Sequence, residues 1–197
     1  YHHLDTLFTM SSMTFDQQLT ITKAAFMPET GIVASDFLAY HAINNNNIIN
    51  WLVDNGWLYC SKDDNFTLSI HPVIAEIVIE KLKANPDLLH AFYSHAMVSL
   101  PWKSQALSHR VHDQLCKAIA SITMRSFIVA RPAAVYLIRH AEHPAVRNSH
   151  ASNLSQFKYA ISVIEGEISV AQYSAILEYA HLCHIQACAE PNALDAS

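Results

Sequence analysis

The chain has 197 residues, of which 51% are hydrophobic, and only 3 glycines and 7 prolines interrupt them. This composition favours a mainly helical globular protein and excludes a disordered chain or an all-β sandwich. No apolar run reaches the roughly 20 residues that a membrane-spanning helix needs. The first residues contain neither a basic segment nor the apolar core of a secretion signal. We therefore expect a cytoplasmic protein that does not contact a membrane.

The net charge of −5 lies entirely in the N-terminal part of the chain. Residues 1–84 contain four lysines and nine acidic residues, whereas the remaining residues contain eight of each sign. The chain also has four cysteines, at positions 60, 116, 183 and 188. A chain of this length has an ample core without disulfides, so we expect these thiols to be reduced.

The spacing of apolar residues predicts a first helix after Thr14. Thr14 can cap its start, with Gln17 as the partner three residues on in a capping box. Pro28 and Gly31 then mark a turn. The predicted apolar face of this helix consists of Phe15, Leu19, Thr22 and Phe26.

Two further helices are predicted before residue 57. A short one runs from about Ser35, taken as its N-cap, to Tyr40. The polar run Asn44–Asn47 supplies a turn and an N-cap for the next, which Gly56 ends. The predicted apolar face of that third helix consists of Ile48, Ile49, Leu52 and Val53.

Two short strands follow, Trp57–Cys60 and Phe66–Ile70, separated by the polar turn Ser61–Asn65. Such a pair predicts a β-hairpin. Pro72 then suits the first turn of another helix, where its missing N–H does no harm. Three helices, a hairpin and a closing helix predict a winged helix-turn-helix domain over residues 1–84.

Residues 85–197 are predicted to form a helical domain, with Pro86 at its boundary. An amphipathic helix covers residues 104–122, and a short helix lies between two prolines over residues 131–144. Two longer helices, joined near Gly166, form a pair over residues 152–189. This pair is typical of the start of a tetratricopeptide-like repeat array. The apolar stripe of the amphipathic helix is Leu107, Val111, Leu115, Ile119 and Ile122.

A winged helix ordinarily binds DNA through its third helix. Asparagines in the third helix here could contact adenine. However, no lysine or arginine occurs between Ala34 and Cys60, while Asp36 and Asp54 add negative charge. Because DNA affinity comes largely from cations that neutralise phosphates, we do not expect this domain to bind DNA.

Three marks in the sequence together resemble the winged-helix module of the STAND signalling ATPases, the NB-ARC-type proteins. They are the turn Met27–Ile32, the segment Asn55–Leu58 before the hairpin, and the exit Ile70-His71-Pro72. The resemblance covers about residues 5–84, and the helical remainder matches only in architecture. In this family an ATPase domain precedes the winged helix, and tetratricopeptide-like repeats often follow it. The resemblance thus implies that the chain is a fragment of a larger parent protein.

The resemblance also implies a role for His71. In the family, a histidine at this exit reaches the β-phosphate of bound ADP and holds the closed, inactive state. An imidazole N–H beside a helix N-terminus suits a diphosphate, since the helix dipole adds to the hydrogen bond. Pro72 replaces the acidic residue of the family motif and removes its side-chain hydrogen bond. The alternative reading of the residues is that His71 only caps the helix or packs on the hairpin.

No catalytic or metal site is predicted. The sequence has no G-x-x-x-x-G-K-[ST] phosphate loop, so the chain alone is not expected to be an enzyme. We expect the chain to hold no cofactor itself, and the resemblance implies that ADP or ATP binds in the intact parent. His181, His184 and Cys188 share one face of a predicted helix, and the pairs His109/His112 and His140/His143 are spaced three apart. With 13 histidines such spacings arise by chance.

The resemblance therefore implies a regulatory fragment of a signalling ATPase. Its winged helix would latch the nucleotide-binding domain of the same parent, and its helical region would sense a protein or small-molecule trigger. One alternative is a stand-alone winged-helix transcription regulator with a helical ligand-binding or dimerisation domain. Another is a purely structural helical adaptor.

Overall fold

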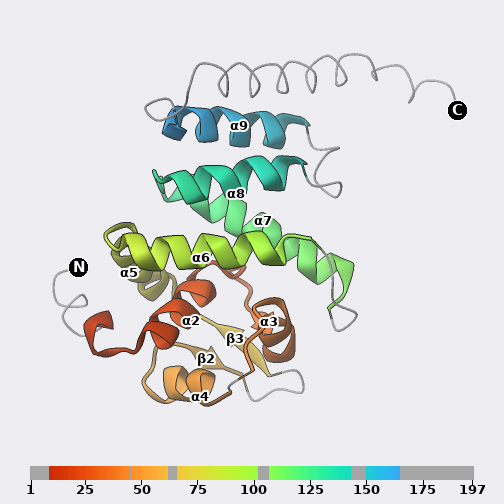
Figure 1. The fold of residues 1–197 in the computed structure, drawn as a ribbon. Coiled ribbons are helices and arrows are strands. Elements are labelled where there is room, and N and C mark those ends of the chain that lie inside the picture. Colours follow the sequence, from red (N-terminus) through yellow and green to blue (C-terminus); the bar gives the residue numbers. More distant parts are fainter. Residues whose placement is uncertain (1–8, 45, 62–65, 102–106, 143–149, 165–197) are drawn as a thin grey trace, which may run out of the picture. The chain divides into compact units, whose positions relative to one another are not determined.

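The structure, a computed structural model, describes residues 9–44, 46–61, 66–101, 107–142 and 150–164. These residues are mainly helical and include one small three-stranded sheet (Figure 1). They fall into two compact units, residues 1–128 and 129–197. Among the described residues, no helix combines the length and apolar composition that crossing a lipid bilayer requires.

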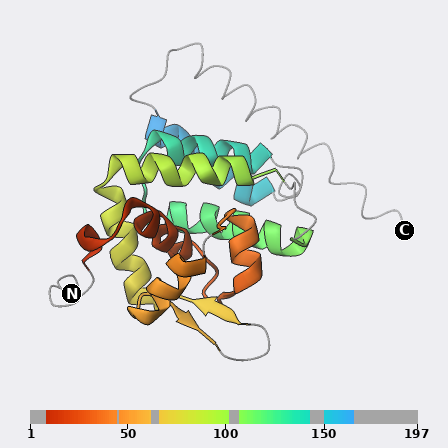
Figure 2. The same ribbon diagram turned by 60° about the horizontal axis from the view of Figure 1, so that its bottom comes forward.

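The first unit contains all three strands and most of the helices. Its sheet lies at the end of the unit away from α6 in both Figure 1 and Figure 2. The elements of this unit are η1 (Met10–Ser12), α2 (Phe15–Ala25), β1 (Ile32–Val33), α3 (Ala34–Tyr40), α4 (Asn46–Asp54), β2 (Tyr59–Cys60), β3 (Thr67–Ser69), α5 (Pro72–Lys83), α6 (Pro86–Ser99) and α7 (His109–Arg125).

Helix α2 begins as predicted. The Thr14 backbone N–H donates to Gln17 Oε1 at 2.9 Å, and the Gln17 N–H donates to Thr14 Oγ1 at 3.3 Å, which completes the capping box. The predicted one-sided apolar face is wrong in part, because Phe15 is 48% exposed. Helix α2 packs against α4, α5 and α6, so its C-terminal half is buried on all sides, from Thr20 to Ala25.

The prediction that Ser35 caps α3 is wrong. The helix begins at Ala34, directly after β1, and its N-cap position is Val33 without a side-chain cap. The Ala34 N–H instead donates to the Phe66 carbonyl at 3.0 Å. A carbonyl next to strand β3 therefore satisfies the first N–H donor of the helix.

Helix α4 ends as predicted, at Gly56. This glycine has a φ of 74°. Its N–H donates to Val53 O at 3.0 Å, and the Trp57 N–H donates to Leu52 O at 2.9 Å. These two bonds make a Schellman motif, in which a glycine takes the left-handed position at no steric cost.

The predicted hairpin is present, with Tyr59 opposite Ser69 and Cys60 opposite Leu68. The sheet also contains a strand that was not predicted, β1, which pairs antiparallel with β3 and gives the order β1-β3-β2. Gly31 precedes β1 with a φ of 77°, and a Cβ there would lie 2.6 Å from the Leu68 carbonyl oxygen. Only glycine permits the chain to approach β3 this closely.

Helices α5, α6 and α7 complete the first unit. Helix α6 packs against α2 and α5, so the position 84–85, where a domain boundary was expected, is a turn within this unit. The rings of Phe26 and Phe92 lie 4.3 Å apart in the core. A hydrogen bond of 2.8 Å between Tyr93 Oη and Thr123 Oγ1 connects α6 to α7.

Of the predicted apolar stripe, α7 buries Leu115, Ile119 and Ile122 and half-buries Val111. Leu107 is buried but precedes this helix, which begins at His109 with Ser108 as its N-cap and not near residue 104. The second unit contains α8 (Arg131–Glu142) and α9 (His150–Ile164), which pack against each other. In this unit His140 Nδ1 lies 2.9 Å from Gln156 Oε1. Of the predicted helix pair 152–189, α9 supplies the first member, and the second lies outside the described residues.

Candidate functional site

His71 lies between β3 and α5, at the N-cap of that helix. Its backbone is extended, with φ −65° and ψ 134°, and its Nδ1 accepts a hydrogen bond from the Val73 N–H at 3.2 Å. Pro72 occupies the first helical position, as predicted. The capping role is therefore present in the structure, and the imidazole is exposed.

The capping bond determines which ring nitrogen of His71 is a donor. Because Nδ1 accepts from a backbone N–H, the neutral ring carries its proton on Nε2. Few other donors remain in this first turn. Pro72 has no N–H, the Val73 N–H is used by the cap, and the Ala75 N–H donates to His71 O at 3.0 Å. The hydrogen-bond donors that remain for an anion at this end of α5 are the Ile74 N–H and the Nε2–H of His71.

Two of the three sequence marks come together around β3. The turn that ends in Gly31 lies against β3, close to Leu68, and the exit segment with His71 follows β3 directly. The third mark, which contains Gly56, precedes β2. The sheet therefore brings the first turn and the His71 segment to the same strand.

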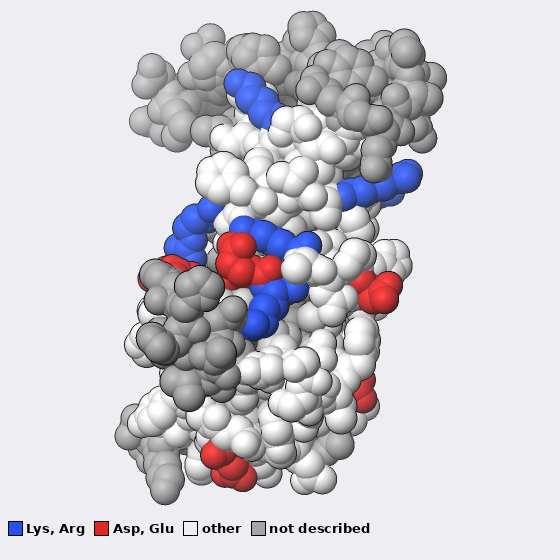
Figure 3. Space-filling model, turned by 90° about the vertical axis from the view of Figure 1, so that its left-hand side faces the viewer, with Lys and Arg blue, Asp and Glu red and all other residues white. Residues whose placement is uncertain are grey.

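The exposed side of α4 carries no positive charge. Asn46, Asn47, Asn50 and Asp54 are its exposed residues. A groove of about 540 Å³ lies beside α4, and neither lysine nor arginine is among its described lining residues. Figure 3 agrees, since the visible charged residues at its lower end, where α4 lies in Figure 1, are acidic. This surface does not suit a nucleic-acid backbone.

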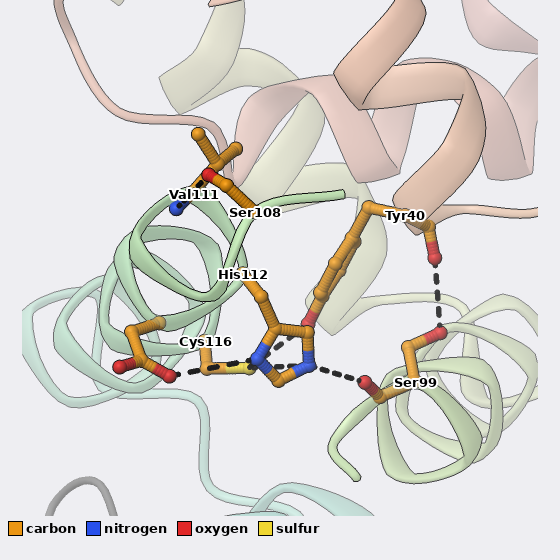
Figure 4. Close-up of polar contacts among 7 residues, drawn as sticks. Tyr40, Ser99, Ser108, Val111, His112 and Cys116 are labelled. Carbon is orange, nitrogen blue, oxygen red and sulfur yellow. Dashed lines mark hydrogen bonds and ion pairs between the residues drawn. The ribbon is translucent and has the colours of Figure 1, made fainter. Parts of the chain in front are cut away.

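A second polar site, not predicted from the sequence, lies inside the first unit around Tyr40. Tyr40 Oη lies 3.3 Å from Cys116 Sγ, and the Ser99 hydroxyl donates to the Tyr40 carbonyl at 3.2 Å. His112 Nε2 lies 2.9 Å from Ser99 O and must donate to it, because a carbonyl only accepts. Figure 4 shows how these side chains connect α3, α6 and α7.

The Cys116–His112 pair is not arranged for nucleophilic catalysis. The sulfur lies 3.9 Å from Nδ1 and 3.8 Å from Nε2. Nearly equal distances to both nitrogens mean that the sulfur is not in line with the lone pair of either one. Nε2 is moreover used by Ser99, and Cys116 is only 3% exposed. An activated thiolate needs an aligned base and access to substrate.

Three basic side chains meet at the C-terminal end of α3, and we call Lys23, His41 and His95 the basic cluster. Lys23 Nζ donates to the His41 carbonyl at 3.4 Å, and the rings of His41 and His95 are 5.7 Å apart. His41 Nδ1 is buried and has no hydrogen-bond partner among the described residues. Lys23 and His41 are 5% and 3% exposed, and His95 is half-buried.

Burial keeps the two histidines of this cluster uncharged at neutral pH, while Lys23 remains mainly protonated. Desolvation lowers the pKa of Lys23 to about 8, although the charge of Asp16 acts in the opposite direction. Desolvation and then the nearby Lys23 charge lower the pKa of His95 to about 4, against a hydrogen bond to the His41 backbone. The same two causes, with His95 as a third, place the pKa of His41 well below its ordinary value. A low-dielectric site disfavours the charged form of each base.

The histidines and cysteines considered as metal ligands in the sequence do not form a metal site in the part of the chain that the structure describes. His112 contacts Ser99 and Cys116, and His140 contacts Gln156. No group of three or more metal-ligating side chains occurs within the described part of the chain. His143, His181, His184 and Cys188 lie outside it.

Comparison of the chain with protein-family models, with curated proteins and with solved structures gives no match.

Proposed function

We propose that this chain is a regulatory part of a STAND-type signalling ATPase, with a winged helix over residues 1–84 and a helical sensor region after it. The order of elements supports this reading of the first part. Helix α2, strand β1, helices α3 and α4, the β2–β3 hairpin and helix α5 follow in the sequence that a winged helix requires, in a sheet of order β1-β3-β2.

The observation that carries the proposal is the placement of His71. Its ring is exposed between β3 and α5, and its Nδ1 accepts from the Val73 N–H. Its Nε2–H remains as a donor beside the N-terminus of α5. A diphosphate presented by a nucleotide-binding domain of the parent would meet this donor and the positive end of the α5 dipole. Hydrogen bonds to charged groups contribute about 1.5–3 kcal/mol, enough to bias two conformational states by 10-fold or more.

The role of the chain is regulatory and not catalytic in this proposal. Its sequence lacks a phosphate loop, and the one described cysteine next to a histidine is buried. ADP bound to the parent would keep the winged helix latched through His71. A protein or small-molecule trigger on the helical region would favour the released arrangement.

The test uses the intact parent with His71→Ala, and His90→Ala as the matched control, because His90 is an exposed histidine on α6. We expect the His71 variant to retain about 10-fold less ADP after purification and to show raised basal activity, while the control behaves as wild type. Equal ADP occupancy in the two variants would remove the sensor role.

The stand-alone transcription regulator remains a second candidate because of the asparagines exposed on α4, which are residues that contact adenine in DNA complexes. Its test is binding of residues 1–197 to mixed DNA duplexes at rising salt. We expect no binding above that of a neutral protein even at 50 mM salt. Tight binding that weakens steeply with salt would favour the regulator.

A further inference from the structure

We propose that the basic cluster is an acid-sensitive joint that holds the C-terminal end of α3 against α2 and α6 and releases it when the histidines are protonated. The inference is independent of the proposed function, because it rests on Lys23, His41 and His95 and not on His71. It assigns a regulatory response to residues in the core of the first unit.

The last carbonyls of α3 are held by side chains from other helices. Lys23 of α2 donates to His41 O, and Ser99 of α6 donates to Tyr40 O. Carbonyls at a helix C-terminus have no partner within the helix and carry the negative end of its dipole. These two bonds therefore supply what the end of α3 itself lacks.

The turn after α3 is strained as well. The Ala42 N–H donates to Ala39 O at 3.4 Å, and the Ile43 N–H donates to Leu38 O at 3.0 Å. This is the same Schellman pattern that ends α4, but the left-handed position holds Ala42, with a φ of 48°, instead of a glycine. A Cβ in this conformation costs roughly 1 kcal/mol. The start of this seven-residue helix is held by the buried Phe37 and by packing on β1 and β3, so the contacts of the basic cluster act on its C-terminal end.

The cluster has no buried acid to balance added protons. No aspartate or glutamate is among the buried polar side chains in the described part of the chain. Among the described titratable groups, Asp16 of α2 acts on Lys23 and the ring of Tyr40 contacts that of His41. Beyond Tyr40 lie His112 and Cys116 of α7, with Asp113 beside His112. Of these, Asp16 is exposed at the start of α2, and Asp113 lies 3.6 Å from His112 Nδ1. Protonation of His41 or His95 would place a second positive charge beside Lys23 without compensation.

The direction of the pH effect follows from linkage. Both histidines have a lower pKa in the closed joint than in the open one, so the open form binds more protons as the pH falls from 6.5 toward 4. A buried histidine stays neutral in the closed joint and is protonated in the open one, which raises the open fraction by up to about 20-fold between pH 7 and pH 5. The half-exposed His95 contributes less. We expect the open fraction to rise on the order of 100-fold over this range.

Cys116 reports on the opening because Tyr40 Oη of α3 lies against its sulfur. The full chain is labelled with 4,4′-dithiodipyridine at pH 7 and pH 5, and the modified Cys116 peptide is quantified by mass spectrometry. Each rate is divided by that of the unfolded peptide at the same pH. We expect the corrected rate of the wild type to rise on the order of 100-fold.

The variants His41→Phe and His95→Phe should each flatten this rise, whereas His90→Gln on the exposed face of α6 should not. Ala42→Gly keeps all three basic residues and relieves the turn, so it should lower the labelling at both pH values. If the histidine variants do not fold, Ala42→Gly and Lys23→Met, which removes the neighbouring charge, still test the joint. The proposal would be overturned if the corrected Cys116 labelling rate of the wild type rose less than 3-fold between pH 7 and pH 5. It would also be overturned if His90→Gln reduced this rise as much as the His41 and His95 variants do.

Hydrogen exchange of the α5 backbone separates a local release from general unfolding. We expect α3 amides to exchange through an opening of lower free energy than the unfolding that exposes buried α5 positions such as Val78, at both pH 7 and pH 5, while both lose protection as the pH falls. Equal protection in α3 and α5 at both pH values would show that α3 is exposed only when the whole unit unfolds and would contradict a joint at α3.

Discussion

His71 and His41 both lie at helix ends in the first unit. They differ in which end of the helix they occupy, in their exposure and in their hydrogen bonds. His71 starts α5, is exposed, and uses a ring nitrogen to accept from the backbone. His41 ends α3, is buried, and offers its carbonyl to Lys23 while its Nδ1 stays without a partner among the described residues. The same residue type therefore serves as a cap with a free donor at the surface and as an uncharged ring in the core. Burial, and not the local sequence, separates the two roles.

The largest difference between the two positions should appear in the pH dependence of stability. Since His41 and His95 have a lowered pKa in the folded chain, their contribution is present above pH 6.5 and is lost as the pH falls toward 4. We expect the free energy of unfolding to fall by roughly 3 kcal/mol between pH 7 and pH 5, after allowance for the half-exposed His95. Urea titrations monitored by far-UV circular dichroism measure this change. A His41→Phe/His95→Phe double variant with the same loss would contradict the account.

Removal of the buried Lys23 amine should have the next largest effect on the free energy of unfolding. Lys23→Met removes a charge that burial destabilises, at the cost of one hydrogen bond to His41 O. We expect it to raise the free energy of unfolding by about 1–3 kcal/mol at pH 7. Because the folded pKa of Lys23 is about 8, the amine becomes neutral in the folded state above that pH, and the gain should shrink toward pH 10.

Lys83→Met is the control for that variant. Lys83 forms an exposed ion pair with Glu80 on α5, and such pairs contribute little. A change within about 0.5 kcal/mol is expected for it. An equal gain from both substitutions would show that removal of positive charge, and not burial, causes the effect.

At the surface, substitutions of His71 should change the free energy of unfolding less than substitutions in the basic cluster do. His71→Ala removes the cap of α5 and should cost about 0.5–1 kcal/mol, whereas His71→Asp keeps a capping acceptor and adds a favourable charge at the helix N-terminus. Thermal denaturation of the two variants should therefore place Asp at or above wild type and Ala below it. The reverse order would mean that His71 does not act as the cap in solution.

Features that depend on neighbouring residues could be predicted from the sequence. The Thr14–Gln17 capping box, the Gly56 helix end, Pro72 at the start of α5 and the hairpin each arise from interactions within a few residues. Strand β1 could not be predicted, because two residues carry no periodicity and their pairing with β3 is a long-range contact.

The two candidate sites, His71 and the basic cluster, differ in the same respect. The position of His71 between β3 and α5 follows from a strand, a proline and a helix that adjoin in the chain. The basic cluster depends on the packing of α2, α3 and α6, which brings together residues up to 72 positions apart. Lys23 follows apolar and small residues in α2, and only the three helices around α2 show that this lysine is buried. The Ser35 cap failed because β1 enters α3 directly.

The most direct test of the proposed latch is the rate at which ADP dissociates from the proposed parent ATPase carrying His71→Asp. This substitution keeps the cap of α5 and replaces the Nε2–H donor by a carboxylate that repels a phosphate. The account predicts dissociation at least about 10-fold faster than wild type, with unchanged thermal stability. An ADP dissociation rate equal to wild type would contradict a phosphate contact at His71 and leave this residue as a helix cap alone.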